Sequence, residues 1–349
     1  MPSRALAMLA LVAALPALGG CALIAGLEDS MLAPTPGVLD CDAATDQTQC
    51  DLVTGCASKV LATMLEDPNG IAVDDEHVYW TLDNPMMVKA QLFRAAHDGK
   101  GAEPMLADGT ASEAEAVVVD DVNAYVADDA AHTILRVSKD ATSAAPAVVA
   151  SDLGYLRALL AAPEGIYFAN NDGGGSVGLA PAGGGAPVKI GELNQAQALA
   201  LDKDYLYWVE SGDFDQNNGR AMRARRKDLG APTLLADGLN HPASIAVDAT
   251  DAYVATDDAI VRLPKSGGTP ETVATDQGGP RALAFSHAGL FWGRHNSNTK
   301  GGGVALLPPG AAEEVLVYEG DSPERIALAC SGIYFTQGGQ GQVVRLTRD

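Results

Sequence analysis

One short pattern recurs along most of this 349-residue chain and limits the folds that it can adopt. An apolar run, often closed by Asp, is followed within a few residues by a second run that contains an aromatic residue. Successive copies lie 38 to 46 residues apart, and their aromatic residues are Tyr79, Tyr125, Tyr167, Tyr207, Tyr253, Phe291 and Tyr334. Repeats of this length built from short apolar runs predict the blades of a β-propeller, each a sheet of four strands.

The first unit shows where the four strands, A to D in chain order, are expected. They are residues 71–73, 78–80, 91–94 and 104–107. The seventh unit stops after its strand C, at 343–346, while residues 59–62 have the pattern of a strand D and precede the first unit. We therefore predict an all-β, seven-bladed propeller in which the N-terminal strand completes the last blade and removes the exposed sheet edges. Six blades is the alternative if residues 155–194, the weakest unit, form only a loop.

Two of the units resemble known propeller repeats. Tyr79-Trp80-Thr81-Leu82-Asp83 is similar to the YWTD repeat, and Tyr253-Val254-Ala255-Thr256 is similar to the YVTN repeat of the NHL-like class. The resemblance covers residues 59–349 and implies the propeller fold without implying an activity. The chain departs from the YWTD family in one respect, because YWTD propellers have six blades and seven units are counted here.

Residues 1–20 have the pattern of a secretory signal peptide. Arg4 gives a short positive start, and the apolar run 5–18 is too short to span a bilayer comfortably. Leu18-Gly19-Gly20-Cys21 resembles the lipobox of bacterial lipoproteins, which implies that Cys21 carries the lipid and begins the mature chain. An ordinary signal peptide with an incidental cysteine is the alternative. Because Ala22 and not Asp follows Cys21, the resemblance implies lipid anchoring in the outer membrane of a bacterial cell envelope, facing the periplasm or the outside.

Residues 21–58 are expected to form a polar tether ahead of the propeller at 59–349. Four further cysteines, in an oxidising compartment, are expected to form disulfides in one of three pairings. Cys330 falls in the A–B turn of the seventh unit, and Cys56 enters that unit from the same face, so we expect Cys56 to pair with Cys330 and Cys41 with Cys50. A metal site is the alternative, although the spacing fits no known zinc pattern.

Comparison of the units with one another shows two residue types that occur together. Asp closes strand A and Arg occupies strand C in the same four units: Asp74 with Arg94, Asp120 with Arg136, Asp202 with Arg223, and Asp248 with Arg262. Neither occurs at these positions in the third and sixth units, and the seventh has Arg345 without the Asp. Because Arg binds carboxylates through two parallel hydrogen bonds, we expect four structural Asp–Arg pairs.

The formal net charge of −22 argues against nucleic acid or an anionic membrane surface as partner, because both need basic surface. Acidic residues concentrate in the expected B–C and D–A loops, for example Glu113, Asp128, Asp129, Asp257 and Asp258. We expect these loops to form an acidic face that binds an envelope protein or a small polar or cationic ligand. A solvated surface without a partner is the alternative.

Residues just before each strand A are expected to meet at the mouth of the central channel. This ring contains Asn69, Glu115, Arg157, Gln197, Ala243, Arg281 and Glu324, with Arg325 beside the last. Converging polar groups can bind a small polar ligand or can satisfy one another.

One loop has the spacing of calcium ligands. Asp213, Asp215 and Asn217 alternate as in an EF-hand, but Gly219 comes one residue late and Ala224 replaces the bidentate Glu. No cofactor is expected, and calcium is the weaker alternative.

No H-E-x-x-H motif occurs in the sequence. His132, His241 and His295 are nevertheless expected in loops of one face. A resemblance to the seven-bladed lyases and metal-dependent lactonases of this fold class implies an alternative function on a small polar substrate. The expected function is a lipid-anchored binding scaffold in the cell envelope, with a propeller enzyme as the alternative.

Overall fold

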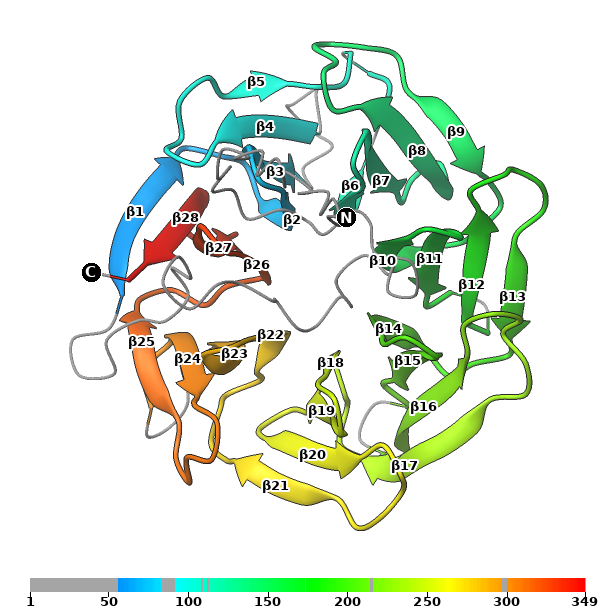
Figure 1. Cartoon of the computed structure of the whole chain (residues 1–349), viewed down its shortest axis with the longest axis vertical. Helices are drawn as coiled ribbons and strands as arrows, with labels where there is room; N and C mark the ends of the chain where they lie inside the picture. The colour runs from blue at the N-terminus through cyan, green and yellow to red at the C-terminus, as the bar shows by residue number, and fades with distance from the viewer. Residues whose placement is uncertain are drawn as a thin grey trace, which may run out of the picture.

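The computed structural model describes residues 56–82, 92–107, 109–111, 113–172, 174–213, 216–296 and 300–348. In these ranges 28 strands form seven antiparallel sheets of four strands, arranged around a central axis (Figure 1). The chain is therefore a seven-bladed β-propeller, as predicted. The six-blade alternative is wrong because residues 155–194 contain a complete sheet. Across the described ranges, no helix has the length and apolar character needed to cross a membrane.

Each of the first four blades is a meander of consecutive strands. Blade 1 contains β2 (Pro68–Val73), β3 (His77–Leu82), β4 (Leu92–Ala96) and β5 (Glu103–Pro104). Blade 2 contains β6 (Ala114–Val119), β7 (Asn123–Asp128), β8 (Thr133–Ser138) and β9 (Ala147–Ala150). Blade 3 contains β10 (Leu156–Ala162), β11 (Gly165–Asn170), β12 (Ser176–Pro181) and β13 (Val188–Gly191). Blade 4 contains β14 (Ala196–Leu201), β15 (Tyr205–Glu210), β16 (Gly219–Arg225) and β17 (Thr233–Leu239).

The last three blades follow the same order until the ring closes. Blade 5 contains β18 (Ser244–Val247), β19 (Asp251–Ala255), β20 (Ile260–Pro264) and β21 (Glu271–Ala274). Blade 6 contains β22 (Arg281–Ser286), β23 (Gly289–Arg294), β24 (Gly303–Leu307) and β25 (Val315–Glu319). Blade 7 contains β26 (Arg325–Ala329), β27 (Gly332–Gln337), β28 (Gln342–Thr347) and, as its outer strand, β1 (Ala57–Ala62).

The N-terminal strand closes the ring, as the sequence predicts. β1 pairs antiparallel with β28, with Ser58 opposite Leu346 and Val60 opposite Val344. Figure 1 shows β1 on the rim beside the C-terminal strand. The backbone N–H of Cys56 also donates to the Val317 carbonyl of β25, at 3.0 Å. Closure therefore joins the start of the described chain to its last strand and to the neighbouring blade.

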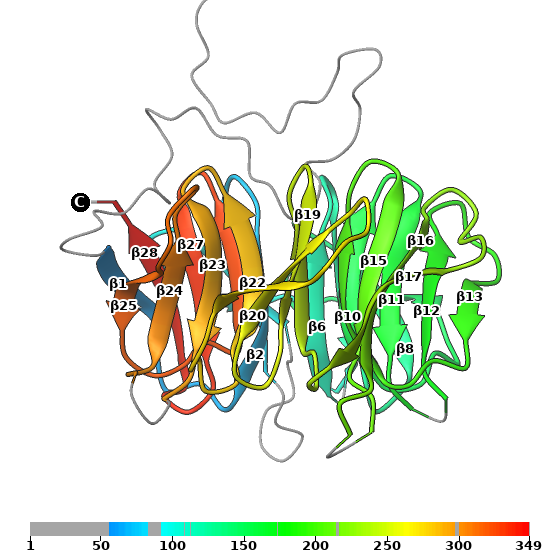
Figure 2. The same ribbon diagram turned by 90° about the horizontal axis from the view of Figure 1, so that it is seen from below.

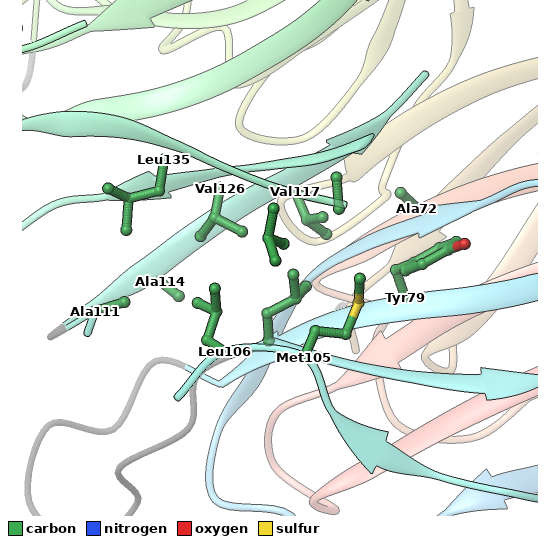
Figure 3. Packing of buried hydrophobic residues seen from close by; sticks show 12 residues of the cluster. Ala72, Tyr79, Met105, Leu106, Ala111, Ala114, Val117, Val126 and Leu135 are labelled. Carbon is green, nitrogen blue, oxygen red and sulfur yellow. The ribbon is translucent and has the colours of Figure 1, made fainter. Parts of the chain in front are cut away.

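Apolar side chains fill the spaces between blades. At the interface of blades 1 and 2, Ala72 and Tyr79 pack with Met105, Val117 and Leu135 (Figure 3). Comparable clusters occur at the other blade interfaces. Full burial of such side chains contributes about 1.5–3 kcal/mol each, so the ring is held mainly by contacts between blades.

Strand D of the first blade is shorter than the expected 104–107. Only Glu103 and Pro104 form β5. The Met105 N–H still donates to the Leu92 carbonyl of β4 at 2.9 Å, and the side chains of Met105 and Leu106 are buried in the interface with blade 2. The Ala107 N–H donates to the Ala144 carbonyl at 2.8 Å and ties this segment to blade 2.

The propeller has two different ends, seen from the side in Figure 2. We call the end with the B–C and D–A connections the loop face; it carries Glu115, Arg157 and Arg325 near the starts of the A strands. We call the end with the A–B and C–D turns the turn face; it carries the four Asp residues that follow the A strands, Asp74, Asp120, Asp202 and Asp248.

Asp caps the A–B turn in four blades. The Asp74 carboxylate accepts hydrogen bonds from the backbone N–H groups of Glu76 and His77, at 2.9 and 2.8 Å, and from the Tyr79 hydroxyl, at 2.8 Å. The same contacts recur in three more blades, each with the Tyr five residues later: Asp120, Asp202 and Asp248. A side chain that satisfies two turn amides and a buried hydroxyl explains why Asp occupies this position.

Glycine replaces this device in the other three blades. Gly165, Gly289 and Gly332 begin strand B with φ of +146°, +126° and +145°. A Cβ at Gly165 would lie 2.1 Å from the Ala180 carbonyl oxygen. The two-residue turns of these blades need glycine and not an Asp cap, because only glycine fits this backbone. The absence of Asp from the third, sixth and seventh units follows from that difference.

The predicted Asp–Arg pairs are not formed. In each Asp blade the Arg lies on strand C directly opposite the Tyr of strand B: Tyr79 faces Arg94, Tyr125 faces Arg136, Tyr207 faces Arg223, and Tyr253 faces Arg262. The tyrosine strand therefore separates each Arg from the Asp on strand A.

Most of these arginines have partners elsewhere. Arg94 and Arg262 bind Glu103 and Glu271 of their D strands. Arg223 donates to the Lys265 carbonyl at 2.7 Å, and Arg136 is exposed. Asp and Arg occur together because each contacts or faces the same Tyr, and not because they bind each other.

The cation that meets the Asp comes from the next blade. Lys139 of blade 2 lies 2.8 Å from Asp74 of blade 1, and Lys265 of blade 5 lies 2.7 Å from Asp202 of blade 4. Burial raises the pKa of both carboxyls, but hydrogen bonds from the Lys, the Tyr and the turn amides outweigh it and hold each pKa below its usual value. These ion pairs join neighbouring blades at the turn face.

Blade 3 reaches the same arrangement with a different acid. Glu164, in the turn before Gly165, accepts two hydrogen bonds from the Arg226 guanidinium of blade 4, at 2.9 and 3.0 Å, and one from the Tyr167 hydroxyl at 2.7 Å. At the closure, His97 Nδ1 of blade 1 lies 2.5 Å from the Tyr334 hydroxyl of blade 7. Burial lowers the pKa of His97, so a neutral imidazole occupies this position.

Candidate functional site

Four of the predicted ring residues meet at the axial mouth of the loop face. Glu115, near the start of β6, is buried and accepts a hydrogen bond from the Asn69 amide, 2.8 Å to Oε2. Its Oε1 lies 3.2 Å from Arg325 Nη2 and 3.4 Å from Arg157 Nη1. These partners come from blades 1, 7 and 3. The A strands converge on the axis, so a side chain at the start of each can reach its counterparts.

The remaining ring residues are less closely joined. Arg281 and Glu324 approach to 3.8 Å, and the exposed fractions of their side chains are 53% and 32%. Arg325 also donates to the Glu324 carbonyl at 3.1 Å. Gln197 contacts Ser211 within its own blade, with 3.3 Å between the amide nitrogen and the hydroxyl. The structure therefore assembles one cluster around Glu115 and leaves Gln197 outside it.

The axial mouth is not acidic, although acidic residues are numerous in the loops around it. Three guanidinium groups, Arg157, Arg281 and Arg325, lie with two carboxylates, Glu115 and Glu324. Arg157 Nε is buried and has no hydrogen-bond partner among the described residues. A buried donor without an acceptor costs about 1–3 kcal/mol.

A carboxyl beside this cluster has a raised pKa. Asp129 lies in the B–C loop of blade 2. Burial raises its pKa to about 6, the Leu156 N–H bond opposes that shift, and the negative charge of Glu115 adds to it. Asp129 therefore changes charge near neutral pH, within the field of the Glu115 cluster.

The three loop-face histidines have different surroundings and do not form one site. His295 follows β23 beside Arg281; its Nε2 is buried and has no partner among the described residues. Burial and the charge of Arg281 lower the pKa of His295, so its imidazole is neutral at pH 7. His132 has a buried Nδ1 that meets no hydrogen-bond partner within the described ranges, and its ring packs edge-on against Tyr155. His241 instead lies 3.2 Å from Asp257 and 3.1 Å from the Asp213 carbonyl.

Metal binding has limited support in the described part of the chain. No group of three or more His, Cys, Asp or Glu side chains is placed there to hold a metal ion. Of the predicted calcium ligands, Asp215 lies outside the described residues. The Asp213 carboxylate accepts a 2.8 Å hydrogen bond from the Asn218 amide. Calcium binding at this loop stays a prediction.

The structure describes two of the five cysteines. Cys21, Cys41 and Cys50 lie outside the described residues. Cys56 and Cys330 are each disulfide-bonded. The pairing of these cysteines stays a prediction.

Solved structures with the same architecture include several enzymes. A streptogramin B lyase has a TM-score of 0.66 at 13% identity, with 85% of this chain and 99% of that chain covered. A catalytically inactive histidine-to-alanine variant of virginiamycin B lyase from Staphylococcus aureus, solved with quinupristin, has a TM-score of 0.60 at 20% identity, over 83% and 99%. A putative gluconolactonase has a TM-score of 0.51 at 12% identity, over 86% and 97%.

At these identities the likeness shows the propeller fold alone. No protein-family profile and no curated protein sequence matches the chain. Function must therefore be argued from the site.

Proposed function

We propose that the propeller is a binding protein whose axial mouth on the loop face takes a small polar ligand with a carboxylate or other oxygen-rich group. The observation that carries this proposal is the cluster around Glu115, to which blades 1, 3 and 7 contribute Asn69, Arg157 and Arg325. Guanidinium groups bind carboxylates through paired hydrogen bonds, and a concave site with a few converging polar groups is typical of ligand binding.

Isothermal titration with hydroxylated carboxylates such as gluconate, galacturonate and tartrate tests the proposal. We expect saturable binding by one of them and at least tenfold weaker binding by the Arg157→Gln variant. Arg136→Gln is the matched control, because Arg136 is an exposed arginine on the opposite end of its blade. Equal affinity in Arg157→Gln and wild type, or no saturable binding by any of these acids, would contradict the proposal.

We also propose that this binding protein is anchored in the bacterial cell envelope. The lipobox-like sequence ending at Cys21 supports lipid attachment, and the acidic loops around the axial mouth, including Asp257 and Asp258, offer a surface for an envelope protein. Metabolic labelling with a radioactive fatty acid should mark the wild-type chain and not the Cys21→Ala variant. Labelling of both chains would reject anchoring at Cys21.

A second candidate function is general acid–base catalysis at the same mouth. His295 supports it, because its imidazole is neutral, lies beside Arg281 and Glu324, and has no hydrogen-bond partner on Nε2 among the described residues. The enzymes among the similar folds are consistent with this reading. His295→Gln should then abolish turnover of a substrate that still binds, whereas a binding protein would show no turnover in either form.

A further inference from the structure

The residue that follows strand C has a repeated role at the turn face. In three blades it is a cation that reaches back to the acid and tyrosine of the preceding blade: Lys139, Arg226 and Lys265. Lys265 Nζ lies 2.7 Å from Asp202 and 5.1 Å from the centre of the Tyr207 ring. Arg226 lies 5.9 Å from the Tyr167 ring centre while it binds Glu164. The acid–tyrosine pair of this propeller is thus a cation receptor used repeatedly within the ring.

Blade 5 has the same acid–tyrosine pair, but the residue that follows strand C of the next blade is not a cation. Asp248 Oδ2 accepts a 3.2 Å hydrogen bond from the Tyr253 hydroxyl, and its Oδ1 accepts the turn N–H groups of Thr250 and Asp251. The residue after strand C of blade 6 is Pro308, which carries no charge. The Asp248–Tyr253 pair of blade 5 therefore receives no cation from the residue after strand C of blade 6.

A groove opens where that cation would lie. Its volume is about 1140 Å³, and its lining includes Asp248, Tyr253, Phe285, Leu290, Pro308 and Pro309. Tyr253 and Phe285 form a tilted ring pair with 4.8 Å between centres. The lining of the groove thus combines a carboxylate, an aromatic pair and apolar side chains.

The other charged groups in the groove leave Asp248 as the acceptor. Lys265 Nζ is paired with Asp202 and also donates to the Asp248 main-chain carbonyl at 2.6 Å, and Arg262 is paired with Glu271. Lys203 and Asp204 lie in the exposed turn of blade 4, and their opposite charges offset each other. A cation that enters the groove therefore meets Asp248 without displacing an existing ion pair.

We propose that this groove binds an alkylammonium or alkylguanidinium group. The cationic end would sit against Asp248 Oδ2 and the Tyr253 ring, as Lys265 does against Asp202 and Tyr207. The aliphatic stem would lie along Phe285 and Pro308, since long cationic side chains bury their methylenes on apolar surface. The same chemistry is present in a free aliphatic amine and in a Lys side chain of a protein partner.

Titration of the full chain with cadaverine and, separately, with Nα-acetyl-lysine amide tests the proposal by calorimetry. We expect at least one probe to bind saturably and Asp248→Asn to weaken that binding at least tenfold. The Asn keeps an acceptor for the turn amides, so the fold should survive. Asp74→Asn is the matched control, because Asp74 makes the same turn and tyrosine contacts in blade 1 but already holds Lys139; it should leave binding unchanged.

A second variant tests the site from the protein's side. Pro308→Lys should place an internal ammonium on Asp248, abolish binding of the probes and raise the melting temperature. Binding of cadaverine alone would point to a free amine as the ligand, and binding of the lysine amide would point to a side chain. Absence of saturable binding by both probes, or equal binding by Asp248→Asn and wild type, would overturn the proposal. Because the groove is on the turn face, these results do not depend on the axial site.

Discussion

The ion pair between Asp202 and Lys265 should couple blades 4 and 5 measurably, and a double-mutant cycle with Asp202→Asn and Lys265→Met tests this. The two groups are 2.7 Å apart, and only 21% and 11% of their side chains are exposed. At an effective dielectric constant of about 20, the direct attraction is about 6 kcal/mol. Desolvation offsets most of it, so we expect a coupling free energy of about 1–2 kcal/mol.

Equilibrium unfolding in urea, followed by tryptophan fluorescence, measures the coupling. Trp208 lies in blade 4 and reports on that blade. The Arg262–Glu271 pair of blade 5 is the matched control, because its side chains are 40% and 60% exposed; its coupling should be much smaller, since solvent screens exposed pairs. Equal coupling in the two cycles would refute the argument that burial makes the contact between blades the stronger one.

The pH dependence of this coupling has a definite sign. Burial raises the pKa of Asp202, yet hydrogen bonds from Lys265, Tyr207 and the turn amides bring it below the usual 3.8. A group with a lowered folded-state pKa stabilises the fold above its unfolded pKa and loses that contribution as the pH falls through the folded value. The coupling should therefore be constant from pH 5 to 7 and decrease below about pH 4.

Three further changes test separate parts of the structure. Asp129, with its pKa raised to about 6, should lower stability as the pH rises from 4 to 6, so Asp129→Asn should be more stable than wild type at pH 7 by about 1–2 kcal/mol in thermal unfolding. Gly165→Ala should cost at least about 3 kcal/mol because its Cβ would meet a carbonyl at 2.1 Å, whereas Gly183→Ala, with open space around it, should cost little; unfolding in urea compares them. Leu61→Ala in the closing strand should cost about 2–4 kcal/mol, and the exposed Val60→Ala less, and equal losses would contradict a packed closure.

The ring and its closure could be predicted from the sequence because each depends on the repeat itself. Strand B of every unit brings an aromatic residue at the same position, and the seventh unit lacks a strand that residues 59–62 can supply. The position of the axial cluster was also accessible, since the starts of all A strands must approach the axis. Which partners these side chains contact at the axial mouth depends on their rotamers, which the repeat pattern does not determine. The contact of Gln197 with Ser211, for example, could not be predicted from the repeat.

The Asp–Arg prediction was wrong for an instructive reason. Residues that occur together in a repeat can share a third residue, and here Tyr stands between Asp and Arg on the intervening strand. The real cations follow strand C of the next unit, so a comparison restricted to single units could not find them. Glu164 was missed because its turn is built around Gly165 and shifts the acid by two positions. The sign of it in the sequence was Tyr167 of the third unit, which has no Asp five residues before it.

The pairing of β1 with β28 has a mechanical consequence. A force applied to the chain ahead of Cys56 does not unravel the propeller one blade at a time from its end, because the first described strand is paired into the last blade. The force acts first on the β1–β28 ladder, starting at the pair of Ala57 with Thr347. A propeller pulled at its N-terminus would thus resist until this ladder fails, after which blade 7 would lose its outer strand and the ring would open between its two ends.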